Sequence, residues 1–133
     1  WYYGYDTKNP PKPVVPAKYT KMYAEFEKMW GNLGSLMAET ERRHGSAAGG
    51  EVWQVDTIPL IIQGILSADS IDVDKVVKAM EAWEAIPTYF GIGKWGGKET
   101  FGIKHAIAKP YPLVLGMGGK IAEVMCFTPE PLP

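Results

Sequence analysis

FGIKHAIAKPYPLVLGMGGKI, residues 101–121, carries the pattern that says most about the fold class. The first part has the alternation of a β-strand, a Lys-Pro pair interrupts it, and a second apolar run follows. A turn at Gly118-Gly119-Lys120 then leads into a third strand. Glycine and proline punctuation of this kind predicts short β-strands joined by turns. His105 lies in the first strand, at the edge of the expected sheet, and we interpret it as structural and not catalytic.

The chain before residue 87 has helical periodicity instead. Four aromatic residues spaced by four, three and four positions predict an amphipathic helix. They are Tyr19, Tyr23, Phe26 and Trp30. A glycine-weakened continuation is expected to end at Gly45. The segment 7–16 contains four prolines, which exclude a helix or a central strand and predict an extended connector.

Two further helices are expected after the flexible segment 45–50. Pro59 falls within the first, and we expect it to kink that helix by removing a hydrogen bond to Val55. Asp72 is suited to cap the N-terminus of the second helix. The residues expected to form the apolar faces are Val52, Val55, Ile58, Ile62, Ile65 and Leu66 in the first helix, and Val73, Val76, Val77, Met80 and Trp83 in the second.

Length and composition limit the classes of protein. A chain of 133 residues is sufficient for one domain with a core, and its net charge of −1 gives no electrostatic case for nucleic acid or an anionic membrane. Cys126 is the single cysteine, so no internal disulfide can form. The longest apolar run, 58–66, is far shorter than the ~20 residues that span a bilayer. No signal-peptide pattern is present, and a first residue that is Trp suggests a processed or excised piece.

No motif in the sequence indicates catalysis. GIGKWG, residues 91–96, matches a dinucleotide-binding pattern, but a strand-like segment follows it where a helix is required, so we expect its glycines to form turns. His44 and His105 lack metal-ligand spacing, and Cys126 reads as a small apolar strand residue. No pair of carboxylates is spaced for hydrolysis. We therefore expect no cofactor, no metal and no enzyme activity.

The order of these elements resembles a known family. A proline-broken segment, a tyrosine-rich helix and a glycine break precede EVWQVDTIPLIIQGILSADSIDVDKVVKAMEAW and FGIGKWGGKETFGIKHAIAKPYPLVLGMGGKI. This order, over about residues 1–123, resembles the C-terminal portion of the solute-binding proteins of branched-chain amino-acid ABC importers, the leucine/isoleucine/valine-binding family of type I periplasmic binding proteins. The matching features are Trp53 and Asp56 at a helix start, the cap Asp72, the strand Gly102–His105, Pro110 and the Gly119-Lys120 turn.

The resemblance implies an α/β fold made of partial type I periplasmic binding protein lobes. Three main helices would be followed by C-terminal antiparallel β-strands. Residues 1–133 would form a single C-terminal segment, in which residues 1–86 supply the helical part of one lobe. Residues 87–133 would supply the crossover and the strands of the other lobe. The larger N-terminal part of such a protein would precede this chain.

The function implied is the extracellular or periplasmic solute-binding component of an ABC importer. It would capture a small amino-acid-like or aromatic solute between two lobes and present it to a membrane permease. The resemblance places the loop before the helix that contains Pro59 at the mouth of the cleft. There Glu51 could meet an ammonium group, and Trp53 could form a wall against an apolar moiety. Tyr3 and Tyr5 are further ligand-binding candidates near the hinge. Purely structural roles remain open, with Glu51 favouring a helix dipole and Trp53 lying in the core.

A different reading stays open beside this one. The chain could be a self-standing small α+β domain, a sensor or an interaction module without catalysis, that shares only the order of elements. In the first reading the isolated chain would expose apolar helix faces and strand edges, so we expect it to form a homo-oligomer. The solute itself is not identified by the sequence.

Overall fold

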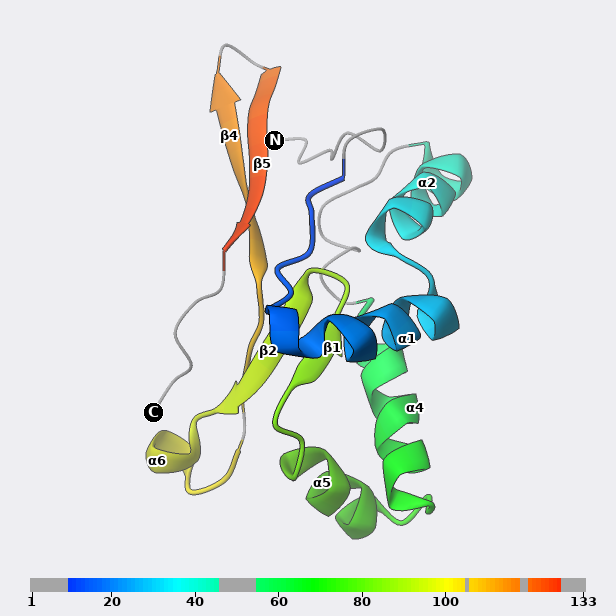
Figure 1. Ribbon diagram of the computed structural model, residues 1–133, viewed down its shortest axis with the longest axis vertical. Coiled ribbons are helices and arrows are strands. Elements are labelled where there is room, and N and C mark those ends of the chain that lie inside the picture. Colours follow the sequence, from blue (N-terminus) through cyan, green and yellow to red (C-terminus); the bar gives the residue numbers. More distant parts are fainter. Residues whose placement is uncertain (1–9, 46–54, 105, 118–119, 128–133) are drawn as a thin grey trace.

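The computed structural model describes residues 10–45, 55–104, 106–117 and 120–127, and for residues 112–127 it describes the backbone alone. The fold is mixed α/β, with the main helices preceding antiparallel strands, as the sequence predicted, but with four main helices in the described residues where three were expected (Figure 1). The helical elements are η1 (Ala17–Tyr19), α1 (Thr20–Trp30), α2 (Leu33–His44), α4 (Thr57–Ala68), α5 (Val73–Glu81) and α6 (Lys98–Phe101). The strands are β1 (Ile86–Thr88), β2 (Gly91–Gly96), β3 (Ala106–Ala108), β4 (Tyr111–Met117) and β5 (Lys120–Phe127).

The described strands form two separate antiparallel groups. One sheet has the order β1-β2-β3, and β4 pairs with β5 in a two-stranded ribbon. The register of the ribbon shifts between Leu115 and Gly116. In Figure 1 α1 crosses in front of the β1–β2 hairpin, α2 and α4 lie to its right and α5 below it, while the β4–β5 ribbon extends upward, away from the helices. The molecule therefore has a compact body and a projecting arm.

The described part of the proline-rich segment, from Pro10 onward, is extended as predicted and docks on the sheet. The Val14 N–H donates to the Phe90 carbonyl (2.9 Å), and the Ile92 N–H donates to the Val14 carbonyl (3.0 Å). Gly91 sits between these bonds with a φ of 129°, and a Cβ there would lie 2.1 Å from the Val14 oxygen. Only glycine allows this approach of two backbones.

The core joins α1 and α2 to the β1–β2 hairpin. Tyr23 and Phe26 are buried at 6% and 4% exposure, and Met37 and Phe90 are fully covered. The Phe26 and Tyr89 rings meet edge to face, with centroids 5.5 Å apart. The predicted aromatic face of α1 is confirmed, since Tyr19 and Trp30 also pack against this cluster. Gly45 ends α2 in the left-handed conformation, which is also as predicted.

Two expectations for the next helix are wrong. α4 begins at Thr57, so Pro59 lies in its first turn, where a backbone N–H has no helical partner to lose and no kink follows. The burial of the predicted apolar face is also wrong, because Ile58 (68% exposed), Ile62 (37%) and Leu66 (63%) face outward. Leu60 and Gly64 are buried instead. α4 has no charged side chain and only three polar ones, Thr57, Gln63 and Ser67, so its apolar residues occupy more than one face and its sequence fits either orientation.

For α5 the cap is confirmed and the burial is not. The Asp72 carboxylate accepts a hydrogen bond from the Lys75 N–H (3.1 Å). Val73 and Val77 were expected to be buried, but they are 72% and 49% exposed. The helix touches α4 along a narrower line, where the Val76 and Met80 side chains close over Gly64. Within the described residues nothing covers the rest of that face.

The segment 101–121 follows its prediction in part. Strands β3 and β4 lie on either side of the Lys109-Pro110 break, and β5 follows. The segment after Gly96 is not strand-like, however, because Lys98–Phe101 forms the short helix α6 between Gly97 and Gly102, both at positive φ. His105 and the residues 118–119 lie outside the described part of the chain.

Candidate functional site

The ligand-binding residues predicted from the sequence all fall outside the described residues. Tyr3 and Tyr5 precede residue 10, and Glu51 and Trp53 belong to the segment 46–54. The structure therefore neither brings these side chains together nor separates them. The described residues do contain a buried charged cluster, centred on Asp56. Asp56 follows the predicted ligand-binding loop closely in the sequence.

An ion pair joins Asp56 to a residue far along the chain. The Lys109 ammonium lies 2.6 Å from Asp56 Oδ2, and the exposed fractions of the two side chains are 20% and 4%. The other carboxylate oxygen, Oδ1, accepts a hydrogen bond of 2.7 Å from the Tyr89 N–H. Each Asp56 oxygen thus has a donor, as a buried carboxylate requires. The Lys109 ammonium also lies 5.9 Å from the centre of the Phe90 ring.

The position of each member follows from the local sequence. Asp56 immediately precedes α4 but does not cap it with its side chain, so its carboxylate is free to turn toward the sheet. Tyr89 occupies the tight connection between β1 and β2, and Lys109 occupies the break between β3 and β4. The cluster therefore ties the start of α4 to the β1–β2 connection and to the β3–β4 connection. Sequence analysis noted Asp56 and the Lys-Pro break separately, and no local signal paired them.

Phenol groups extend the network on the side of α1. The Tyr23 hydroxyl lies 2.9 Å from the Thr88 carbonyl and 3.2 Å from the Tyr89 carbonyl, and it donates to this pair. The Tyr89 hydroxyl donates to the Trp30 carbonyl (2.8 Å). Thr88, fully buried, donates its own hydroxyl to the Gly91 carbonyl (2.9 Å). These bonds satisfy polar atoms at the turn where the β hairpin meets α1.

This network holds the fold together and does not favour acid–base chemistry. Burial, followed by the nearby negative charge of Asp56, raises the pKa of the Tyr89 phenol above its usual value of 10.0. Tyr89 is therefore a neutral hydrogen-bond donor at physiological pH and not a base. Both oxygens of the Asp56 carboxylate are engaged in the fold, one by the Lys109 ammonium and the other by the Tyr89 N–H. The cluster is best understood as a tether.

The other motifs considered from the sequence also have structural roles in the described residues. GIGKWG forms strand β2, and the four-residue α6 that follows it starts beyond the last glycine, so the geometry of a dinucleotide loop is absent there. His44 ends α2 next to two arginines, where positive charge favours the helix dipole. Among the described residues no three His, Cys, Asp or Glu side chains are grouped so as to hold a metal ion.

Neither the described helices nor the comparisons with known proteins assign this chain to a class of protein. Throughout the described ranges, every helix lacks the length and continuous apolar character needed to cross a membrane. No protein-family model matches the sequence, and the comparisons with curated proteins and with solved structures give no match.

Proposed function

We propose that this chain is part of the solute-binding component of an ABC importer and works at the extracellular or periplasmic side. In this proposal two lobes close on a small amino-acid-like or aromatic solute, and a membrane permease receives it. The resemblance in the order of elements supports this reading, as does the mixed α/β architecture with helices preceding antiparallel strands. Nothing is transformed, because binding energy is spent on lobe closure.

The outer face of α4 is the observation that carries the proposal. The twelve residues of α4 contain no charged side chain. Ile58, Ile61 and Leu66 are 68%, 49% and 63% exposed on the side away from the core. A helix that buries apolar side chains on one side and exposes large apolar side chains on another is typical of a position inside a larger protein, between two layers. In a two-lobed binding protein this face would rest on the sheet of the lobe to which the helix belongs.

The β4–β5 ribbon supports the same reading. A two-stranded ribbon is marginally stable alone and normally joins a larger sheet. Here it projects from the body (Figure 1), and the chain enters it at Lys109-Pro110, beside the ion pair with Asp56. The resemblance put the crossing to the second lobe just after residue 86, but residues of the β1–β2 hairpin share the core of α1, so we propose the later position at Lys109-Pro110 instead. The tether would then fix the root of the connection while the lobes move.

A self-standing sensor or interaction domain is the second candidate. One observation favours it, namely that residues from α1, α2 and the β hairpin close a core without help from another chain. Met37, Ile86 and Phe90 have no exposed surface. In that case the apolar face of α4 would be an interaction surface, and no solute would be bound between lobes.

Reading the gene upstream of Trp1 and titrating its complete product separates these candidates. The proposal expects a long upstream region with an alternating strand–helix pattern, and calorimetric binding of one amino acid or aromatic acid from a panel. Glu51→Ala and Trp53→Ala should weaken that binding without changing the melting temperature. An unrelated domain or a stop codon upstream, or a complete product that binds no member of the panel, would contradict the proposal. Lowered melting with unchanged affinity would remove these two residues from the site.

A further inference from the structure

A pocket outside the buried cluster lies where three elements meet. Its volume is about 250 Å³. α1 contributes side chains from one face of the helix, spaced three or four residues apart. α4 contributes two residues one turn apart, and the segment that follows α5 and runs into β1 contributes every second residue. The lining residues are Met22, Glu25, Phe26 and Met29 from α1, Gln63 and Ser67 from α4, and Trp83, Ala85 and Pro87 from the segment.

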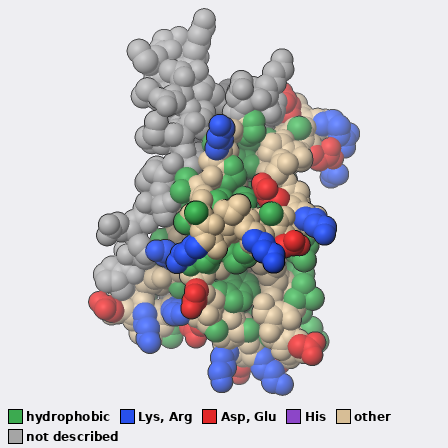
Figure 2. Space-filling model, viewed as in Figure 1, with side chains coloured by type: hydrophobic (Ala, Val, Ile, Leu, Met, Phe, Trp, Pro, Cys, Tyr) green, Lys and Arg blue, Asp and Glu red, His purple; other side chains and the backbone are tan. Residues whose placement is uncertain are grey.

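The walls and floor of this pocket are apolar. Phe26, Ala85 and Pro87 are buried and form the floor, while Ile86 points the other way into the core at 0% exposure. Met29 is 60% exposed and Met22 is 36% exposed, so their flexible thioethers stand at the rim. Figure 2 shows hydrophobic side chains gathered on this face below α1. Such a lining accepts an aromatic ring or a branched aliphatic group.

The polar groups of the pocket are few and carry one sign of charge. Glu25 supplies a carboxylate, Gln63 an amide and Ser67 a hydroxyl, and the lining contains no Lys, Arg or His. Within the described part of the chain none of these three side chains has a hydrogen-bond or ion-pair partner inside the protein. Their capacity is therefore available to a ligand. Glu25 and Trp83 line the same pocket, and a carboxylate and an indole ring each favour an ammonium group.

We infer that this pocket binds small primary amines that carry an aromatic or branched apolar group. The apolar body enters between Trp83 and the methionines, and the ammonium lies against the Glu25 carboxylate. Anionic analogues are disfavoured, because the pocket offers no cation to a carboxylate. The site is formed by described residues of this chain alone, so it does not depend on the function proposed above.

The test titrates phenethylamine into the chain carrying ¹³C-methyl methionine and follows the methyl resonances by NMR. The methyls of Met22 and Met29 should shift with a common saturation curve, and that of Met37, fully buried in the core, should stay in place. Affinity should be weak, in the millimolar range, because the pocket is small and open to solvent. Phenylpropionate, which replaces the amine by a carboxylate, should shift the same methyls much less.

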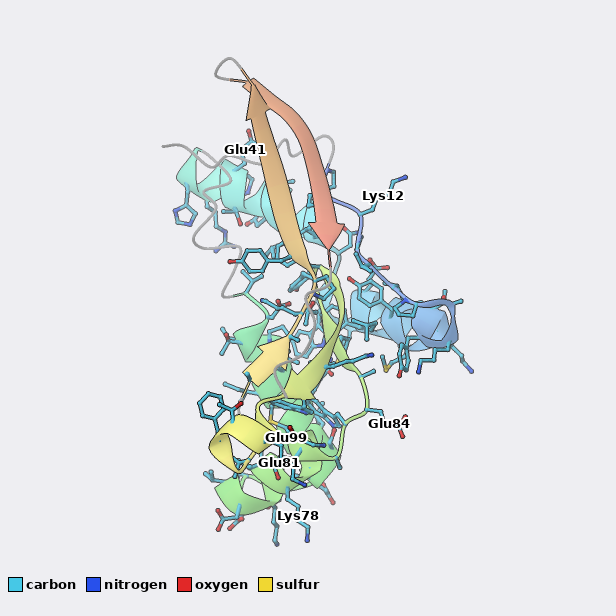
Figure 3. The ribbon with its side chains drawn as sticks, turned by 90° about the vertical axis from the view of Figure 1, so that its left-hand side faces the viewer. Lys12, Glu41, Lys78, Glu81, Glu84 and Glu99 are labelled. Carbon is cyan, nitrogen blue, oxygen red and sulfur yellow. The ribbon has the colours of Figure 1, made fainter. Side chains whose placement is uncertain are left out.

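Two matched variants complete the experiment. Glu25→Gln keeps the shape of the side chain and removes its charge, and should weaken phenethylamine binding about two- to fivefold, as expected for a solvent-accessible pair. Glu99→Gln removes the same charge from α6, a helix that contributes no residue to the pocket (Glu99 is labelled in Figure 3), and should leave binding unchanged. Equal binding of amine and acid, an unchanged affinity in Glu25→Gln, or no shift of the Met22 and Met29 methyls would each overturn the inference.

Discussion

Breaking the Asp56–Lys109 ion pair should destabilise the protein strongly. Asp56→Ala leaves the Lys109 ammonium, 20% exposed, without its carboxylate, and it also leaves the Tyr89 N–H without an acceptor. Removing one partner of a buried pair costs about 3–5 kcal/mol. Lys109→Met should cost a similar amount. The Asp56 carboxylate, 4% exposed, would keep the Tyr89 N–H as a donor and lose the Lys109 ammonium.

The measurement is equilibrium unfolding in urea, followed by tryptophan fluorescence, for wild type, both single variants and the double variant. The double variant should lose about 1–3 kcal/mol less than the sum of the two single losses, because contacting residues are energetically coupled. The control Lys78→Met removes an exposed lysine of α5 (Figure 3) and should change the free energy of unfolding by less than about 0.5 kcal/mol. Additive losses, or single variants as stable as this control, would refute the tether.

Further predictions follow from the backbone, from a surface charge and from the apolar face. Gly91→Ala should cost about 3 kcal/mol or more by chemical denaturation, because its Cβ meets the Val14 oxygen. Gly45→Ala, in the left-handed conformation but with open space around a Cβ, should cost only about 1 kcal/mol. Hydrogen bonds from two arginines lower the pKa of Glu39 from 4.5 to about 2, so its stabilisation of α2 is present above pH 4.5 and is lost as the pH falls through 2. Melting curves of Glu39→Gln and wild type, recorded by circular dichroism, should therefore differ at neutral pH and converge near pH 2, and a constant difference would contradict this. The isolated chain should self-associate through α4, and Ile62→Glu should make it monomeric by light scattering; a wild-type chain that is monomeric at every concentration would refute the association.

Local patterns in the sequence predicted the elements and their ends better than their packing. The aromatic spacing in α1 identified its buried face, because the opposite face is polar and leaves one orientation. Asp72 and Gly45 were predicted correctly since capping depends on neighbouring residues only. α4 has no charged side chain and carries apolar residues on more than one face, so its periodicity could not say which side meets α5. The exposed stripe of Ile58, Ile62 and Leu66 was consequently assigned to the wrong side.

The site residues were harder to predict for a different reason. Asp56 and Lys109 are 53 positions apart, and their pairing depends on how the β hairpin packs against α1. The amine pocket likewise draws single faces from three elements, none of which is distinctive alone. Pro59 was misjudged for a local reason. The rule that proline kinks a helix holds for helix interiors, but Pro59 lies in the first turn of α4. Its effect depends on where α4 begins, and that boundary is set outside the helix.

Small-angle X-ray scattering of the complete gene product, with and without its solute, tests the proposed solute-binding function most directly. The solute would be the member of the amino-acid and aromatic-acid panel that gives the strongest calorimetric signal. If the chain belongs to a two-lobed binding protein, saturating solute should close the lobes and reduce the radius of gyration. A radius of gyration that stays the same at saturation, or a product that binds no member of the panel, would contradict the account.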